Sequence, residues 1–400
     1  MVEHRIECIR SHERLVVLLD AWRRLWARTN GAHAFLRPEW YTAGFKHRVS
    51  EGQPLVCAVR RDGNLAGIVP LRVQRKPLPG GPFTVLTHAL DRIADYTDNL
   101  FAGPGAADFV RVLETLEGRI GWDAVHYRDV PVTSELVRDL QTIAARWPVV
   151  VAPGNVCPYV PVLSTWDDYL KVAFRDSKRR NDFRRKLKKF SRLAGVRLES
   201  EDALAEGRIG YDDLAAVEQS GWRGQSGRGL FGTQARARFY AQVFSALRDE
   251  DMLFLKAVVR DDRLAAYALG FRTPTKHYFY NTAFVPELAP FNAGFQTYIE
   301  AVKACFAEGS REFDMLRGAV EYKNLLTHTA RRNYRMMIFR HNGPAQAYAT
   351  YLRARHGAKC LLHTRRPSYV WHGNIATAAW DAGRRVQHFT RGELPVGSLI

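Results

Sequence analysis

Three short runs rich in β-branched, aromatic and other apolar residues lie close together in the second half of the chain. They are Leu253–Val259, Leu264–Arg272 and Tyr278–Val285. The first two flank a polar, Asp-containing segment and predict a β-hairpin, and the third predicts a neighbouring strand. Apolar positions then recur at helical spacing from Phe295 to Phe306, and Arg311–Leu316 predicts one more strand. The expected order is therefore hairpin, strand, loop, helix, strand.

The loop before this helix ends in Asn292-Ala293-Gly294. The first N–H groups of a helix have no partner within the helix, and small residues let a ligand approach the backbone closely. Together with the helix dipole, these donors predict a phosphate or pyrophosphate site. An ordinary strand-to-helix turn is the alternative interpretation. Neither a Walker lysine motif nor a G-x-G-x-x-G motif is present, which argues against nucleotide folds of those kinds.

The central hairpin has a counterpart in the first half of the chain. Residues Ala58–Ala66 align with Ala257–Ala265 at a constant offset of 199, and six of the nine positions are identical. Both copies follow helical segments and continue into a long apolar strand. A duplicated unit is the more economical interpretation, and a chance match is the alternative.

The first half also predicts helices and strands of its own. The expected elements are helices at Leu15–Arg28, from Pro38, at Phe109–Ile120 and at Leu136–Trp147, with strands at Pro54–Arg60, Leu65–Val73 and Ala124–Tyr127. Where the second half has its loop entering a helix, the first half has Lys76–Pro82, whose Pro-Gly-Gly-Pro sequence predicts a break in structure. The first unit is therefore predicted to be a degenerate copy. Val149–Val162, with three prolines, is predicted to bridge the two halves.

A strongly basic helix is predicted at Ser177–Arg192. It carries nine Lys and Arg residues and one acidic residue, Asp182, while Phe183, Leu187 and Phe190 form an apolar stripe. A solvated helix packed by that stripe explains the apolar residues but not nine positive charges that repel one another. The segment Lys178–Arg192 therefore predicts an anionic partner: a phosphorylated carrier, a lipid surface or tRNA.

Composition limits the class of protein. A chain of 400 residues predicts two domains, and a net charge of +18 with a pI near 9.9 favours polyanionic neighbours, although charge alone is a weak argument for function. No apolar run is long enough to span a membrane and no secretion signal is evident, so we expect a cytoplasmic protein, or one peripheral to the inner membrane surface. The histidines have no metal-ligand spacing and we predict no metal site. The cysteines are odd in number, form no close pair in the sequence and predict reduced thiols: Cys8, Cys57, Cys157, Cys305 and Cys360.

An ordered set of segments carries a family resemblance. Ser177–Arg185, Glu218–Gly224, Asn292–Gln296, and Phe313–Gly318 with Tyr322-Lys323, resemble the GNAT-type acetyltransferases of the CelD/BcsL group, which is associated with bacterial exopolysaccharide and cellulose operons. In the first half, Phe35–Trp40 resembles that group's N-terminal signature. The resemblance implies an α/β fold with mixed sheets and tandem GNAT-like units, the first degenerate. FemAB-type aminoacyl transferases share this double architecture and are the neighbouring interpretation.

The resemblance also implies a set of site residues. The acyl-CoA diphosphate is expected on the helix-entry loop and its pantetheine arm along the third strand, so the cofactor-binding candidates are Thr282, Ala283, Phe284, Asn292, Ala293, Gly294, Phe295 and Gln296. The loop lacks the second glycine of the usual GNAT pattern Q/R-x-x-G-x-G/A. Acyl transfer needs a base and oxyanion donors. The catalytic candidates are Glu218 as base, Asp314 as base or substrate anchor, and Tyr322 as acid for the leaving thiolate. The substrate-binding candidates are Trp222, Arg223, Arg317 and Lys323.

Three function classes follow. The first is an acyltransferase that moves an acyl group, acetyl by preference, from acyl-CoA to an amine or hydroxyl in polysaccharide or cell-envelope biosynthesis. The second is an aminoacyl transferase that uses charged tRNA, and the third is a non-catalytic binding subunit. The expected domains are a degenerate unit at 1–160, an acyltransferase unit at 161–342 and a helical extension at 343–400.

Overall fold

The computed structural model describes residues 3–78, 81–221, 224, 226–227, 229–318, 320–351 and 370–372. The chain divides into two compact units, described separately below. Unit 1 contains the residues up to Asn155 and those from Arg332 onward, and unit 2 contains Val156–Arg331. None of the helices in the described ranges has both the length and the hydropathy that a bilayer span requires.

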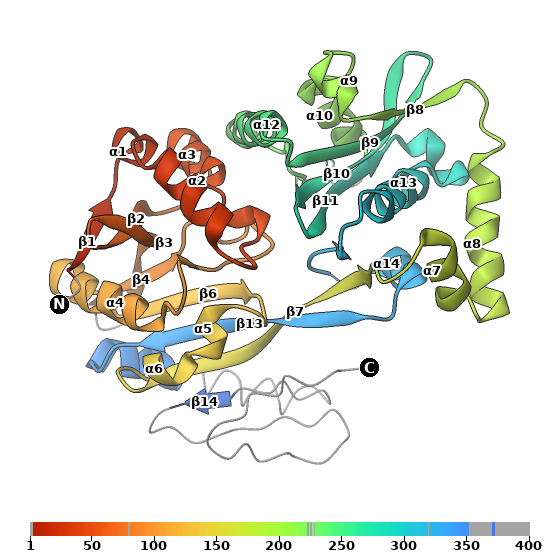
Figure 1. Ribbon diagram of the computed structural model, residues 1–400. Helices are drawn as coiled ribbons and strands as arrows, with labels where there is room; N and C mark the ends of the chain where they lie inside the picture. The colour runs from red at the N-terminus through yellow and green to blue at the C-terminus, as the bar shows by residue number, and fades with distance from the viewer. Residues whose placement is uncertain are drawn as a thin grey trace. The chain divides into compact units, whose positions relative to one another are not determined.

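Unit 1 is built on a mixed sheet with the strand order β1-β2-β3-β4-β6-β13-β7, in which β4 and β6 run parallel (Figure 1). Helix α4 buries Phe109 and Leu113 against one face, while α2 contacts β3 and buries Trp22. The elements are β1 His4–Ile9, α1 His12–Val16, α2 Leu19–Arg28, η1 Ala34–Leu36, α3 Pro38–His47, β2 Gln53–Arg61, β3 Asn64–Leu78, β4 Gly81–His88, β5 Leu100–Phe101, α4 Ala106–Ile120, β6 Ala124–Val130, α5 Glu135–Arg138, α6 Leu140–Ala144, β7 Val149–Pro161, β13 Ala330–Phe339 and β14 Val370–His372.

Unit 2 has the strand order β7-β12-β11-β10-β9-β8, with β11 and β12 parallel. Helix α13 packs on β9, β10 and β11 through an apolar core that includes Phe279 and Tyr298, and α10 and α12 supply further packing, including Phe244 against Phe271. The elements are α7 Trp166–Ala173, α8 Ser177–Phe190, β8 Val196–Ser200, α9 Asp202–Ala205, α10 Tyr211–Ser220, α12 Gln234–Asp249, β9 Leu253–Arg260, β10 Arg263–Thr273, β11 Lys276–Phe284, η2 Pro286–Phe291, α13 Ala293–Ala307, β12 Glu312–Asp314 and α14 Glu321–Leu326.

The two hairpins share an irregularity as well as a sequence. In the β2–β3 ladder Leu65 pairs with Arg60 and Gly67 with Val59, which leaves Ala66 as an extra residue. In the β9–β10 ladder the extra residue is Ala265, at the equivalent position of the repeat. Because a β-bulge changes the local twist and direction of a strand, its recurrence at the same site supports the predicted duplication. The predicted mixed α/β fold is confirmed.

Unit 1 departs from unit 2 in the strand that follows the hairpin. In unit 2 this strand is the continuous β11, whereas in unit 1 it is split into β4 and β5, both of which pair with β3. The intervening residues 89–99 form a loop tied to β6, where the Thr97 N–H donates to the Asp129 carbonyl (3.2 Å). This loop includes the buried Leu90 and Tyr96. The resemblance implies acyl-CoA beside the third strand of unit 2. In unit 1 the loop of residues 89–99 interrupts the corresponding strand.

Three expectations for unit 1 are corrected by the structure. The break expected at Lys76–Pro82 is narrower than predicted, because β3 extends to Leu78 and β4 begins at Gly81, with Pro77 opposite Pro82, while Pro79 and Gly80 lie outside the described residues. The helix expected at Leu136–Trp147 is two short helices, α5 and α6. Val149–Val162 is the long strand β7 rather than an irregular bridge. In the region expected to be a helical extension, residues 343–351 are helical, whereas Val370–His372 form strand β14, and the other residues lie outside the described ranges.

Two cysteines distant in sequence face each other in unit 1. Cys8 and Cys57 are register partners in the β1–β2 ladder, and their sulfur atoms lie 3.8 Å apart. A hydrogen bond from the Cys57 thiol lowers the pKa of Cys8 to about 6, while the same interaction and burial raise the pKa of Cys57. The two cysteines are far apart in the sequence and become neighbours only through the antiparallel pairing of β1 and β2, so their spacing did not predict the pair.

Asp98 gives unit 1 a predictable pH dependence. Burial raises the pKa of this carboxyl to about 7, against the opposing effect of hydrogen bonds from the Ser134 hydroxyl (2.6 Å) and the Asn99 N–H (2.8 Å). A raised pKa means that the folded state retains the proton after the unfolded chain has lost it, so stability falls as pH rises from about 4 to about 7. The full effect is at most about 4 kcal/mol.

Asp98→Asn is therefore expected to remove this loss of stability, because the amide oxygen of Asn can accept both hydrogen bonds without a charge. The measurement is urea unfolding of the wild-type and variant proteins between pH 4 and pH 8. The stability difference should shift in favour of the variant as pH rises and level off above pH 7. Asp20→Asn, at an exposed position, is the control. A difference for Asp98→Asn that does not change with pH would contradict the assignment.

Candidate active site

The candidate site lies at the carboxyl end of β11. Parallel pairing with β12 covers only three positions and ends at Tyr278 opposite Asp314, while β11 continues to Phe284. In the described part of unit 2, the stretch after Tyr278 therefore has a strand partner, β10, on one side only. A bulge at Tyr280, the extra residue between Phe279 and Asn281 in the β10–β11 register, interrupts the regular alternation of side chains.

Glu218 on α10 is joined to this strand by a buried hydrogen-bond network. Its side chain accepts from the Asn281 amide (3.0 Å) at one oxygen and from the Phe231 N–H (3.0 Å) at the other. The Asn281 amide also donates to the Tyr267 hydroxyl of β10 (2.9 Å). Glu218 is 2% exposed, so its position is fixed by donors on a strand and a loop rather than by solvent. The predicted base thus lies beside the part of β11 that extends past β12.

The ends of two helices meet at Phe284, the last residue of β11. A Cβ atom added to Gly294, near the start of α13, would lie 2.7 Å from the Phe284 ring. A Cβ on Gly221, directly after α10, would lie 3.9 Å from the Phe284 carbonyl oxygen. Glycine at position 294 is therefore required for the approach of α13 to the strand. The contact brings the predicted donor loop and the end of the Glu218 helix to the same strand end.

The backbone groups at the start of α13 differ in whether they have hydrogen-bond partners. Asn292 is in the left-handed region (φ 56°), and its carbonyl accepts from the N–H groups of Phe295 and Gln296, both at 3.0 Å. Ala293 and Gly294 are the first residues of α13, so their N–H groups have no acceptor within the helix, and among the described residues the buried Asn292 Nδ2 atom lacks a partner. The loop thus retains unsatisfied donors at the positive end of a long helix.

The other predicted donor-binding side chains are used within the protein. The Gln296 amide donates to Glu300 one turn along the helix (2.9 Å), and the Thr282 hydroxyl donates to the Tyr267 carbonyl (2.8 Å). The Phe295 ring packs in the core beside Phe183, with a centroid distance of 6.1 Å. The polar side chains of Thr282 and Gln296 already donate within the protein, so these residues would contact a ligand mainly through their backbone atoms.

Asp314, the second predicted carboxylate, is fully buried at the end of β12 and satisfied by its surroundings. Its carboxylate accepts from the Leu316 N–H (2.8 Å) and from the guanidinium of Arg331 (2.5 Å), which also pairs with Glu312. These contacts favour a structural role for Asp314 at the end of the strand over the expected role as base or substrate anchor. Arg331, on β13, could not be identified as the partner from sequence spacing.

The remaining predicted residues lie on and before α14. The Tyr322 ring packs edge-on against Tyr298, at a centroid distance of 5.4 Å. The ammonium group of Lys323 is buried and donates to the carbonyls of Met315 (2.6 Å) and Arg317 (3.1 Å), so it fixes the segment that follows β12. Arg317 is partly exposed in that segment. Trp222 and Arg223 lie outside the described residues.

Asn281 is the site residue that sequence reasoning missed. It is the one amide in the otherwise apolar and hydroxyl-bearing run Tyr278–Val285. A buried strand position occupied by Asn requires hydrogen-bond partners, so its presence was a signal for a polar group on a facing helix. Its partner Glu218 was proposed from the family resemblance alone, and the structure connects the two.

Comparisons with known proteins agree with this topology. A family model described as an acetyltransferase (GNAT) domain matches residues 177–324. No curated protein matches the sequence at a significant level. Among solved structures, the crystal structure of FemX aligns with a TM-score of 0.53 at 12% identity, covering 82% of this chain and 96% of that one.

Two further structures align to a similar extent. The C-terminal domain of a putative lysylphosphatidylglycerol synthetase from Agrobacterium fabrum has a TM-score of 0.53 at 12% identity, covering 84% of this chain and 95% of that one. A conserved protein of unknown function from Bacteroides thetaiotaomicron has a TM-score of 0.51 at 11% identity, covering 80% and 97%. At such identities the likeness concerns the fold. The chain therefore has a mixed α/β fold similar to that of FemX, with a GNAT acetyltransferase domain matched at residues 177–324.

Proposed function

We propose that unit 2 is an acyltransferase that moves an acyl group, acetyl by preference, from acyl-CoA to an amine or hydroxyl. The observation that carries this proposal is the convergence of Glu218, the part of β11 that extends past β12 and the start of α13 at Phe284. The GNAT domain match over residues 177–324 supports acyl-CoA as the donor. The unsatisfied N–H groups of Ala293 and Gly294 then suit the diphosphate.

Each group has a defined task in the reaction. Glu218 accepts the proton of the acceptor amine or hydroxyl as that group attacks the thioester carbonyl. The carbon–sulfur bond then breaks, and the CoA thiolate takes a proton for which Tyr322 is the proposed donor. The part of β11 that extends past β12 is proposed to offer main-chain donors to the pantetheine arm and the carbonyl oxygen. Arg317 and Lys323, with Trp222 and Arg223, are the proposed acceptor-binding residues, and Lys323 acts through the carbonyls that it holds.

The acceptor class follows from the resemblance to the CelD/BcsL group. A hydroxyl or amine of a glycan precursor is the proposed acceptor, in polysaccharide or cell-envelope biosynthesis. Aminoacyl transfer from charged tRNA and a non-catalytic binding role are the other two candidates. They differ from the first in the donor that the protein binds, so ligand binding separates them before any acceptor is known.

A thermal-shift comparison with CoA, acetyl-CoA and uncharged tRNA tests the proposal. A ligand present at about one hundred times its Kd stabilises the folded state by about 2.7 kcal/mol, which is a measurable rise in melting temperature. We expect both CoA compounds to raise the melting temperature and tRNA to leave it unchanged. Stabilisation by tRNA alone would favour the aminoacyl transferase, and stabilisation by no ligand would favour the binding subunit.

A further inference from the structure

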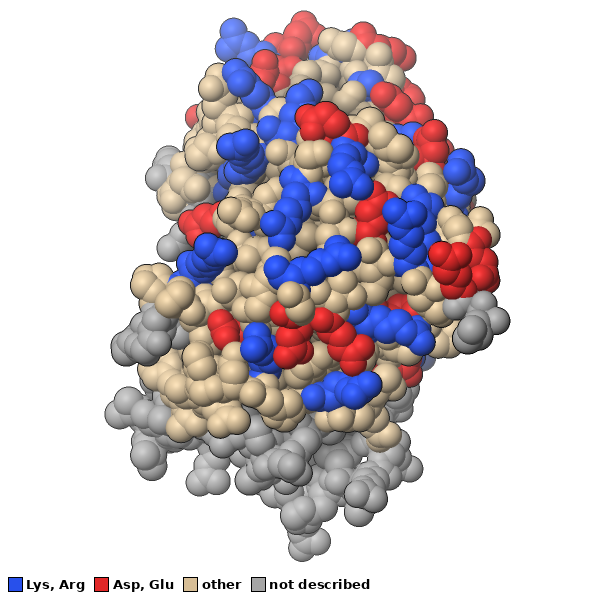
Figure 2. Space-filling model, turned by 90° about the vertical axis from the view of Figure 1, so that its left-hand side faces the viewer, with Lys and Arg blue, Asp and Glu red and all other residues tan. Residues whose placement is uncertain are grey.

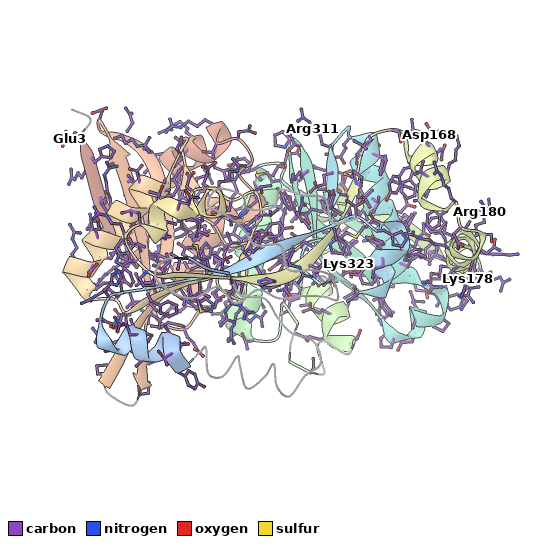
Figure 3. The ribbon with its side chains drawn as sticks, turned by 90° about the horizontal axis from the view of Figure 1, so that it is seen from below. Glu3, Asp168, Lys178, Arg180, Arg311 and Lys323 are labelled. Carbon is purple, nitrogen blue, oxygen red and sulfur yellow. The ribbon has the colours of Figure 1, made fainter. Side chains whose placement is uncertain are left out.

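The outer surface of α8 carries an unusual concentration of one charge. Arginine and lysine side chains are interspersed with acidic ones on the face shown in Figure 2, whereas α8 has one acidic residue, Asp182, among its basic residues. In Figure 3 the helix is seen end-on, and the labelled Lys178 and Arg180 lie on different sides of it. Its exposed cations, called here the basic face, are Lys178, Arg180, Arg184, Arg185, Lys188 and Lys189.

The opposite side of α8 holds the helix on unit 2. Phe183 is buried and its ring packs 4.5 Å from that of Phe174, just after α7. The Lys186 ammonium lies 5.4 Å from the centre of the Phe295 ring on α13. The Arg179 guanidinium donates to the carbonyls of Leu325 (2.7 Å) and Asn324 (2.8 Å). Apart from a hydrogen bond from Arg180 to the Phe174 carbonyl (3.4 Å), these contacts are made by residues outside the basic face.

The basic face is not neutralised by the surrounding protein. Asp182 pairs with Arg185 and, at 3.4 Å, with Lys186. Among the described residues, no carboxylate forms an ion pair with the other five members of the basic face. Several of these cations stand one turn apart, as Arg180 and Arg184 do, and like charges at this spacing destabilise a helix. An anionic partner removes that repulsion.

The neighbouring side chains distinguish between anionic partners. Binding of single-stranded nucleic acid uses exposed aromatic rings for base stacking, but Phe183 and Phe190 of α8 pack inward. Aliphatic side chains are exposed nearby instead: Val172 on α7 is 60% exposed and Leu163, shortly before α7, is 88% exposed. Helices α7 and α8 lie side by side in Figures 1 and 3 and are joined by the Phe174–Phe183 contact.

We propose that the basic face of α8, together with Val172 and Leu163, docks unit 2 on an anionic lipid surface. Cations attract the headgroups of such a surface and nearby aliphatic side chains enter its outer layer. A single helix whose outer side is covered by cations can bring several of them into contact with a flat anionic surface at once. Each cation in contact contributes about fivefold to the affinity.

Vesicle flotation with the full-length protein tests this proposal. The vesicles contain phosphatidylcholine alone or mixed with phosphatidylglycerol, at low and high salt. We expect binding to the anionic vesicles that weakens with salt, and none to phosphatidylcholine alone. Arg184→Glu/Lys188→Glu is expected to lower the affinity by more than about 25-fold, because two contacts worth about fivefold each are lost and become repulsive. Leu163→Ser is expected to lower it severalfold at either salt concentration.

The matched control is Arg24→Glu/Lys46→Glu, which makes the same change of net charge at exposed positions of unit 1. This variant should float as the wild type does. The neutral variant Arg184→Gln/Lys188→Gln should fall between wild type and charge reversal, and circular dichroism checks that each variant is folded. Equal loss in both reversed variants would show a net-charge effect and overturn the proposal. The proposal would also be overturned if the protein did not bind the anionic vesicles but bound tRNA, with the tRNA affinity reduced in Arg184→Glu/Lys188→Glu.

Discussion

Replacing Glu218 by Gln is expected to lower kcat/KM for acyl transfer by about 100-fold, within the range that a general base contributes. The change keeps an oxygen able to accept from Asn281 or the Phe231 N–H, so the shape of the network is conserved while its proton acceptor is lost. The CoA affinity should be unchanged, because the nominated diphosphate donors are the N–H groups of Ala293 and Gly294. Steady-state kinetics with varied acetyl-CoA, and calorimetry with CoA, provide the measurement.

Asp314→Asn is the comparison that separates the two carboxylates. Asp314 is fully buried and paired with Arg331, and the loss of one partner of a buried pair typically costs about 3–5 kcal/mol. This variant should therefore lose thermal stability. In the fraction that remains folded, kcat/KM should fall much less than it does in Glu218→Gln. The assignment of the base would be wrong if Asp314→Asn lost activity at unchanged stability and Glu218→Gln did not.

The elements that depend on local sequence could be predicted. The strands β9, β10 and β11 lie close to the three apolar runs because β-branched and aromatic residues favour extended structure. The basic helix α8 begins at Ser177 as expected, with Asp176 accepting from the Arg179 N–H (2.8 Å) at its cap. The repeat was also visible, since identical residues at a constant offset reflect equivalent backbone positions, including the bulges at Ala66 and Ala265.

Features that depend on pairing between distant segments could not be predicted. β7 contains three prolines, which argued for a connector, yet its register with β12 and β14 makes it a strand. The split of the third strand of unit 1 by residues 89–99 leaves no periodic signal. Asn281 lies 63 residues from Glu218 and Arg331 lies 17 residues from Asp314, and neither spacing indicates a contact. The sequence could therefore nominate the two carboxylates but could not show that one belongs to a network on β11 and the other to a buried ion pair.

Gly294→Val tests whether the start of α13 binds the donor. A Cβ at this position would stand 2.7 Å from the Phe284 ring, so either the ring or the first turn of the helix must move. The loss of two charge-assisted hydrogen bonds to a diphosphate, each worth about 1.5 kcal/mol, corresponds to a reduction in CoA affinity of about 100-fold. Calorimetric titration of CoA into the folded variant measures this loss.

The double variant Gly294→Val/Phe284→Ala shows which part has moved. Phe284 is 39% exposed, and removal of its ring leaves space for the new side chain, so the backbone of α13 can keep its position. We expect the double variant to recover most of the affinity that the single variant loses, and Phe284→Ala alone to bind CoA only a few times more weakly than wild type. We expect this recovery because the N–H groups of Ala293 and Gly294, the proposed hydrogen-bond donors to the diphosphate, return to their original positions. Wild-type affinity in Gly294→Val would show that the diphosphate does not bind at these groups.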